Sequence, residues 1–204
     1  MKTGTVLILP GWQNSGPAHW QSLWESGHGY ARVEQHDWQR PLRGDWIARL
    51  EDVVLDQSAR APGEPITLVA HSLGCLLVAA WAAISRNTQR VACAMLVAPG
   101  DVEREALRPV LTSWSPIALA PLPFPSLLMG SQNDPYCSFE RARYFADAWG
   151  ADVIDYGQCG HINGESGLGG WSEGHQMLRA LQQRALQSEA GGTGEAGDDV
   201  APKF

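Results

Sequence analysis

Short apolar runs alternate along the chain with segments whose apolar residues recur at helical spacing. The runs predict six strands, at residues 5–9, 31–38, 66–71, 91–98, 124–130 and 152–156. The other segments predict helices over about 18–25, 45–58 (with Asp45 as N-cap), 75–83, 102–111, 138–149 and 172–187. Strands that alternate with helices favour a three-layer α/β fold, with a mostly parallel six-stranded sheet and helices on both faces. We expect one domain over residues 1–187, because the chain shows no internal repeat.

The apolar run at residues 66–71 ends abruptly at Ser72, and a helical segment follows. This is the order of a nucleophile elbow, in which the positions two before and two after the serine must be small. Gly74 satisfies the second requirement, and Ala70 replaces the usual first glycine by one extra methyl group. Ser72 is therefore a candidate nucleophile, and the alternative is an ordinary helix N-cap.

Two further polar residues follow later strands. Asp134 lies in an Asn-Asp-Pro turn after the fifth predicted strand, and His161 lies in a glycine-bounded loop after the sixth. The carboxyl ends of parallel strands meet at one edge of a sheet, so these residues are expected to converge with Ser72. A serine needs a base to become nucleophilic, a histidine can take and return the proton, and a carboxylate fixes the histidine tautomer. Asp101, after the fourth strand, is the alternative acid.

The loop after the first strand starts with a Pro-Gly pair and is irregular. In hydrolases with a nucleophile elbow, this loop and the residue after the serine supply the backbone N–H groups of the oxyanion hole, here those of Trp12 and Leu73. The connection over residues 99–123 is too short to form a large cap domain. We expect a pocket for short acyl chains, lined by Trp12, His71, Trp114, Leu119 and Leu122. The other histidines are assigned to surface, loop or helix positions: His19, His28, His36 and His175.

The composition of the chain indicates which partners and which cellular compartment to expect. The 204-residue chain has a formal net charge of −7 and scattered basic residues, which argues against nucleic acid and anionic membranes as partners. The apolar run at residues 5–9 is too short for a signal peptide or a membrane span. The four cysteines show no C-x-x-C pair and no zinc spacing, so we expect a cytoplasmic protein with reduced thiols.

Two features remain outside this scheme. Cys137 and Cys159 lie near two candidate site residues in sequence, and they either fill gaps in the core or have a redox role. Residues 188–204 are rich in Gly, Ala, Asp and Glu, and they are predicted to form a disordered acidic tail.

With these motifs in view, the chain resembles the small serine hydrolases related to retinoblastoma-binding protein nine and their bacterial homologues. The resemblance covers nearly all of residues 4–186. It implies a compact α/β-hydrolase fold without a large cap, a triad of Ser72, His161 and Asp134, and no metal or organic cofactor. It is carried by Pro10-Gly11-Trp12, Gln13-Asn14-Ser15, His19-Trp20, Val33-Glu34-Gln35, Asp37-Trp38, Ala70-His71-Ser72-Leu73-Gly74-Cys75, Ala98-Pro99, Ser131-Gln132-Asn133-Asp134-Pro135 and Gly160-His161-Ile162-Asn163.

The binding to retinoblastoma protein for which that family is named depends on an L-x-C-x-E segment. The nearest stretch here, Leu73-Gly74-Cys75-Leu76-Leu77, lacks the glutamate and is expected to be buried in a helix. We therefore do not expect retinoblastoma protein as a partner.

Residues and resemblance together predict a carboxylesterase-like serine hydrolase that cleaves a small ester or amide through an acyl-enzyme. Two alternatives stay open at this point. A thioesterase uses the same three residues, and a catalytically silent protein of this fold binds other proteins instead. A binding module has no need to keep Ser72, Asp134 and His161 together, which favours the enzyme.

Overall fold

The computed structural model describes residues 4–192 and contains six strands: β1 (Thr5–Leu9), β2 (Ala31–Arg32), β3 (Ile66–His71), β4 (Val91–Val97), β5 (Ser126–Gly130) and β6 (Asp152–Asp155). They form one sheet in the order β2-β1-β3-β4-β5-β6, and every neighbouring pair is parallel. β3 is buried along its whole length, as expected of a central strand that is covered on both faces.

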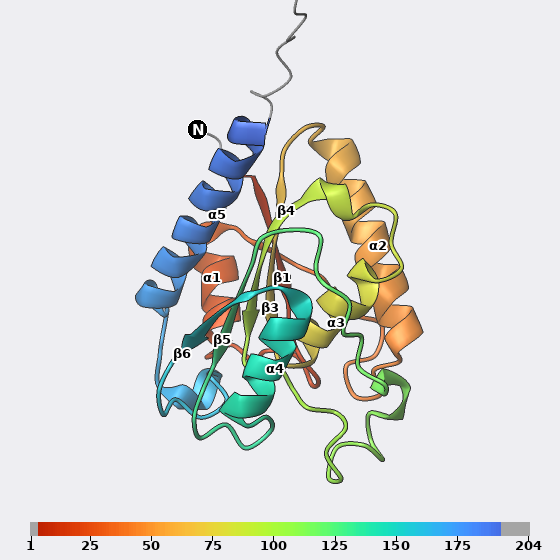
Figure 1. Cartoon of the computed structure of the whole chain (residues 1–204), viewed down its shortest axis with the longest axis vertical. Coiled ribbons are helices and arrows are strands. Elements are labelled where there is room, and N and C mark those ends of the chain that lie inside the picture. The colour runs from red at the N-terminus through yellow and green to blue at the C-terminus, as the bar shows by residue number, and fades with distance from the viewer. Residues whose placement is uncertain (1–3, 193–204) are drawn as a thin grey trace, which may run out of the picture.

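Helices cover both faces of this sheet (Figure 1). α1 (Trp20–His28) and α5 (Ser172–Gly192) pack on one face, and α2 (Arg43–Arg60), α3 (Leu73–Ala82) and α4 (Phe139–Trp149) pack on the other. Short 3₁₀ turns are found at η1 (Thr88–Arg90), η2 (Thr112–Trp114) and η3 (Gly164–Ser166). The sheet and its two helical layers confirm the predicted three-layer α/β fold.

The strands divide the core between the two faces. In β1, Leu7 and Leu9 join the cluster under α2, α3 and α4, whereas Val6 and Ile8 join the cluster under α1 and α5. Successive side chains of a strand point to opposite faces, so both sets must be apolar where both faces are covered. This requirement explains the continuous apolar runs in the sequence.

β2 is much shorter than the strand predicted at residues 31–38. Only its two residues pair with β1. The chain then turns at Asp37, whose carboxylate accepts the N–H groups of the residues two and three positions later, at 2.8 and 2.9 Å. The turn brings the carbonyl of Trp38 within 3.0 Å of the N–H of Gln13. The segment therefore supports the loop after β1 and does not extend the sheet.

The predicted helix over residues 102–111 is wrong. This segment forms successive turns, in which N–H groups donate to carbonyls three or four residues earlier. Pro109 lies within it and has no N–H to donate, so a continuous helical ladder cannot form. The start of α2 also differs: the N-cap is Leu42, and Asp45 lies in the first turn.

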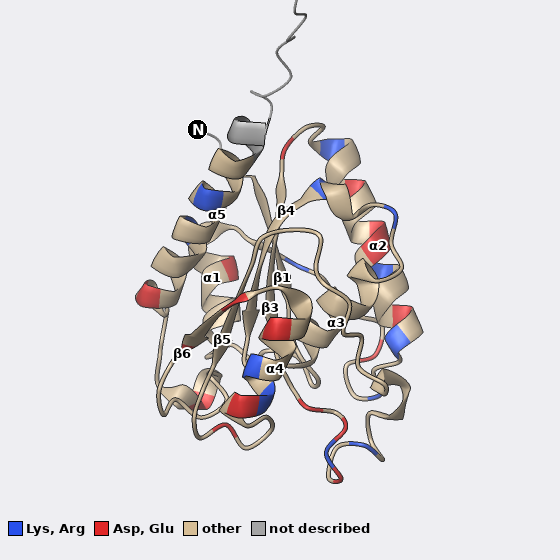
Figure 2. Ribbon diagram, viewed as in Figure 1, with Lys and Arg blue, Asp and Glu red and all other residues tan. Residues whose placement is uncertain are grey.

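α5 continues to Gly192, five residues past the predicted boundary at residue 187. The remainder of the predicted tail, residues 193–204, lies outside the described residues. In the part of the chain that the structure describes, no helix is long and apolar enough to cross a membrane. Acidic and basic residues are interspersed along α2 (Figure 2).

The carboxyl ends of the strands point toward the lower end of the molecule in Figure 1. Ser72 follows β3, Asp134 lies in the loop after β5, and His161 lies in the loop after β6. The parallel sheet thus gathers the loops that carry the three candidate residues at one end.

Candidate active site

Ser72 joins β3 to α3, and its backbone is strained. Its φ is 55° and its ψ is −120°, an uncommon conformation for a residue with a side chain. Its N–H donates to the carbonyl of Val97, and its carbonyl accepts the N–H of Cys75, both at 3.0 Å. The side chain forms no capping hydrogen bond, which argues against an ordinary N-cap role. The turn instead presents Ser72 to a cavity.

Close backbone approach explains the small residues around this turn. A Cβ on Gly74 would lie 2.3 Å from the carbonyl oxygen of Leu9, and a Cβ on Gly11 would lie 2.7 Å from the Cβ of Ser72. Non-bonded heavy atoms do not come so close, so both positions need glycine. Ala70, which replaces the first glycine of the elbow pattern, is fully buried in β3.

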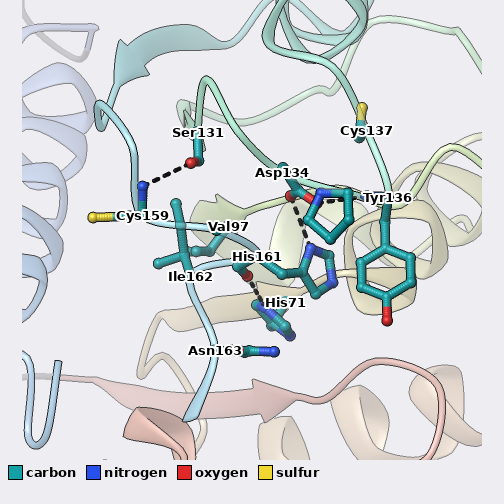
Figure 3. A network of polar contacts seen from close by, with 12 residues as sticks. His71, Val97, Ser131, Asp134, Tyr136, Cys137, Cys159, His161, Ile162 and Asn163 are labelled. Atoms are coloured by element: carbon teal, nitrogen blue, oxygen red, sulfur yellow. Dashed lines mark hydrogen bonds and ion pairs between the residues drawn. The ribbon is translucent and has the colours of Figure 1, made fainter. Parts of the chain in front are cut away.

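His161 and Asp134 come from different loops and meet at hydrogen-bond distance (Figure 3). Nδ1 of His161 lies 2.8 Å from Oδ2 of Asp134, and the other carboxylate oxygen accepts the N–H of Tyr136 at 2.8 Å. The two side chains are only 9% and 2% exposed. A carboxylate can only accept, so Nδ1 of the neutral imidazole carries the hydrogen and Nε2 is left to accept a proton.

The loop that carries His161 is held by hydrogen bonds from both sides. Ser131 Oγ accepts the N–H of Cys159 at 3.0 Å (Figure 3). The indole N–H of Trp20 donates to the carbonyl of Ile162 at 2.8 Å. Ile162 has a φ of 46°, so these bonds hold the loop in a conformation that a β-branched residue rarely adopts.

Asp101, the alternative acid, is engaged elsewhere. Its Oδ2 lies 3.4 Å from Nε of Arg141, and its Oδ1 accepts the N–H of Glu103 at 3.2 Å. Of the two aspartates, Asp134 is the one that contacts His161.

His71 adjoins Ser72 and contacts the backbone of His161. Its Nε2 lies 2.9 Å from the carbonyl oxygen of His161 and must donate, because a carbonyl only accepts (Figure 3). Burial lowers the pKa of His71 well below its usual value, and the neighbouring His161 and His19 lower it further. His71 is therefore a neutral donor that fixes the position of His161.

His19 is a further histidine at the cavity, although its sequence context indicated only a surface, loop or helix residue. As N-cap of α1, its Nδ1 accepts the N–H of Gln21 at 3.1 Å, which places the hydrogen of the neutral ring on Nε2. Burial lowers the pKa of His19 to about 4, with smaller effects of His161 and Arg32. The centroid of its ring lies 4.7 Å from that of His71, so two neutral imidazoles contact each other beside the site.

The cavity has a volume of about 370 Å³, within the range of small-molecule sites. We call one side the elbow wall: Gly11, Trp12, His71, Ser72 and Leu73. The opposite side belongs to the connection over residues 99–125, which we call the rim. The rim lines the cavity with Gly100, Val102, Leu107 and Leu111.

Two backbone N–H groups of the elbow wall are suited to bind an oxygen. The N–H groups of the two residues after Trp12 already donate to backbone carbonyls, at 3.0 and 3.1 Å. In contrast, within residues 4–192 the N–H groups of Trp12 and Leu73 have no acceptor. Leu73 is the first residue of α3, where the backbone N–H has no partner inside the helix.

Three predicted pocket residues do not line the cavity. Trp114 is buried against Trp46, and its indole N–H donates to the carbonyl of Pro41 at 2.8 Å. Leu122 packs against the core, and Leu119 is 38% exposed. The apolar lining comes from earlier in the same connection: Val102, Leu107 and Leu111. The sequence signal that could have indicated it is the position of Val102 shortly after β4.

The cysteines form no disulfide bonds. No disulfide joins any of the four, and burial raises the pKa of the Cys137 thiol to about 12. Cys159 is partly exposed. In the described part of the chain, no three His, Cys, Asp or Glu side chains gather so that they could hold a metal ion.

The chain is similar to proteins of known family and known structure. A family model described as serine hydrolase matches residues 6–180. A crystal structure of a YdeN-like hydrolase from Pectobacterium atrosepticum is 31% identical, with a TM-score of 0.74, over 89% of this chain and 91% of that one. The ydeN product of B. subtilis is 18% identical, with a TM-score of 0.67, over 88% and 98% of the two chains.

A third similar structure is esterase Est2 from Thermogutta terrifontis, solved with butyrate bound. It is 17% identical, with a TM-score of 0.61, over 96% of this chain and 86% of that one. At this identity the likeness concerns the fold. No curated protein matched the chain.

Proposed function

Because the chain belongs to the serine hydrolase family, we propose that it cleaves a small carboxylic ester or amide through an acyl-enzyme formed on Ser72. One observation carries this proposal: His161, which lies 2.8 Å from Asp134, and the strained Ser72 line the same cavity. Strain of this kind clusters at functional sites.

In the acylation step, the hydroxyl oxygen of Ser72 attacks the substrate carbonyl carbon while Nε2 of His161 takes the hydroxyl proton. Asp134 keeps the hydrogen on Nδ1 and stabilises the imidazolium without taking the proton. The carbonyl oxygen becomes negative and is bound by the N–H groups of Trp12 and Leu73, which are fixed before the reaction begins. The C–O or C–N bond then breaks, and His161 returns the proton to the leaving group.

In the second step, a water molecule takes the place of the leaving group. His161 removes a proton from the water as its oxygen attacks the acyl carbon. The bond from the acyl carbon to Ser72 then breaks, and His161 returns the proton to the Ser72 oxygen. The same two N–H groups stabilise this second negative oxygen. The products are a carboxylic acid and the free enzyme.

The substrate is proposed to have a short acyl group. The rim supplies three aliphatic side chains to the cavity, and it contains no helix longer than η2 that could enclose a long chain. Each methylene buried against the rim adds about 0.8 kcal/mol of binding free energy, so a chain that extends past the rim gains no more.

The test is steady-state hydrolysis of p-nitrophenyl butyrate by the purified protein and by Ser72→Ala. We expect saturable turnover that falls by several orders of magnitude in the variant, as removal of a triad residue does in related chemistry. Near-normal activity of Ser72→Ala would end the proposal. Butyryl thioesters assayed beside the ester distinguish a carboxylesterase from a thioesterase, which uses the same three residues.

Three expectations from the sequence stay predictions. These are the cytoplasmic location, the relation to retinoblastoma-binding protein nine, and the lack of binding to retinoblastoma protein. The last is supported by burial, because the segment Leu73–Leu77 lies inside α3 with each residue buried.

A further inference from the structure

A second hollow lies beside the candidate active site, with a volume of about 420 Å³. It shares three lining residues with the first cavity, so the two hollows meet at His161: Tyr136, His161 and Asn163. We call it the outer hollow. Its remaining lining comes mainly from the loop around η3 and from the turn before His161.

The two hollows differ in chemical character. The first has the aliphatic side chains of the rim on one side. The outer hollow has no Val or Leu among its described lining residues, and it has four polar side chains: Gln158, Asn163, Glu165 and Ser166. The first cavity has polar side chains as well, among them Gln13 and Asn14, but no carboxylate among its described residues. Within the described residues that line either hollow, Glu165 is the only carboxylate, and there is no lysine or arginine.

The backbone that carries Glu165 is held firmly. Its N–H donates to Oδ1 of Asn163 at 3.0 Å, and Ser166 Oγ donates to the carbonyl of Cys159 at 2.7 Å. Asn163 and Ser166 close a capping box around η3. The Glu165 side chain, in contrast, is exposed and forms no ion pair with any residue in the described range. A fixed backbone therefore presents an unpaired carboxylate to the outer hollow.

We infer that the outer hollow is the subsite for the leaving group and that it favours a cationic one, such as an amino alcohol or an alkylammonium alcohol. This inference rests on the proposed function. His161 must give its proton to the leaving oxygen as the acyl C–O bond breaks, so the leaving group departs beside the imidazole. His161 lines both hollows. The acyl group then occupies the cavity beside the rim, and the alcohol occupies the outer hollow, where Glu165 attracts its positive charge.

The expected preference is modest. An exposed carboxylate attracts a cation weakly, because water and salt screen the interaction, so we expect about a three- to fivefold effect at low ionic strength. The effect is sufficient for measurement when two substrates of equal shape are compared.

The experiment compares butyrylcholine with 3,3-dimethylbutyl butyrate, in which carbon replaces the charged nitrogen. The measured quantity is the ratio of their kcat/KM values, determined for the parent protein, for Glu165→Gln and for Glu34→Gln. Glu34 is an exposed glutamate after β2 that lines neither hollow, so its variant controls for the loss of one negative charge. We expect the ratio to fall about three- to fivefold in Glu165→Gln and to stay constant in Glu34→Gln.

Salt provides a second readout that a structural defect would not reproduce. Raising the ionic strength should lower the ratio of the parent protein toward that of Glu165→Gln, whose own ratio should change little. An equal ratio in all three proteins overturns the inference, as does an equal decrease in both variants.

Hydrolysis of p-nitrophenyl butyrate separates this inference from the proposed function. If the parent protein hydrolyses that ester and yet does not accelerate butyrylcholine cleavage, the cationic subsite is refuted and the proposed function stands. If it hydrolyses none of the three esters, the proposed function fails and the subsite fails with it.

Discussion

The elbow wall and the rim bound the same cavity but are built in different ways. The elbow wall consists of strand ends and tight turns, where a Cβ on Gly11 would lie 2.7 Å from the Cβ of Ser72. The rim consists of successive turns, where a Cβ on Gly100 would lie 3.6 Å from the hydroxyl oxygen of Ser72, an ordinary contact. One wall is set by close backbone approach and the other by side chains, of which Val102 and Leu111 are buried and Leu107 is partly buried. We therefore expect the chemistry to depend on the first wall and substrate choice to depend on the second.

The largest expected effect separates the two aspartates. Asp134→Asn should lower kcat about 10⁴-fold, because an amide at this position favours the wrong tautomer of His161. Asp101→Asn, on the rim, should change kcat only a few-fold, because its carboxylate pairs with Arg141 and not with His161. Steady-state kinetics with p-nitrophenyl butyrate gives both values. The reverse ranking would transfer the role of the acid to the rim.

The next effect compares two glycines that lie near Ser72 at different distances. Gly11→Ala should lower kcat/KM about 100-fold, because the new methyl group must displace Ser72 and a shift near 1 Å costs that much. Gly100→Ala should change kcat/KM by less than about threefold, because the new methyl group would lie 3.6 Å from the Ser72 hydroxyl oxygen, an ordinary contact distance. Circular dichroism confirms that both variants fold. Equal losses would show that the two walls are equally rigid.

The elbow wall could be predicted from the sequence because its constraints are local. A small residue is required where backbones approach closely, so Ser72 and Gly74 mark the turn. His161, outside this wall, could also be predicted, because it follows a strand in a glycine-bounded loop. The rim could not be predicted in this way. Apolar spacing over residues 102–111 suggested a helix, but Pro109 interrupts it.

Contacts between residues far apart in the chain also could not be predicted from the sequence. Trp114 was expected in the pocket, but its N–H finds the carbonyl of Pro41, which lies 73 residues earlier. His19 was not expected at the site, because a histidine before a helix gives no signal of burial. Both positions depend on which distant segment packs against them, which periodicity does not reveal.

Acid should destabilise the folded protein through His19, which lies beside His71 of the elbow wall. The unfolded chain protonates His19 below about pH 6.5, whereas in the folded protein its pKa is about 4. The unfolded state thus binds more protons between these values, so the free energy of unfolding should fall as pH falls through this window. His19→Asn keeps an N-cap acceptor and should reduce the slope by up to about 1.4 kcal/mol per pH unit. Urea unfolding at several pH values measures it, and an unchanged slope contradicts the burial argument.

The smallest expected effect concerns the rim. Across p-nitrophenyl esters, kcat/KM should peak at a short acyl chain and fall for long ones. Leu107→Ala should lower the butyrate-to-acetate ratio about fourfold, since one buried methylene is worth about 0.8 kcal/mol. Leu119→Ala is the matched control, because Leu119 is exposed and does not line the cavity. A steady rise through dodecanoate would reveal an enclosed channel and reverse the assignment of the rim.

The central claim is that Ser72 is the nucleophile, and covalent labelling tests it most directly. The parent protein and Ser72→Ala are treated with a fluorophosphonate at neutral pH, and intact-mass spectrometry counts the adducts. We predict one adduct on the parent protein, located on Ser72 by peptide mapping, and none on the variant. An adduct on another residue, or equal labelling of both proteins, would contradict the account.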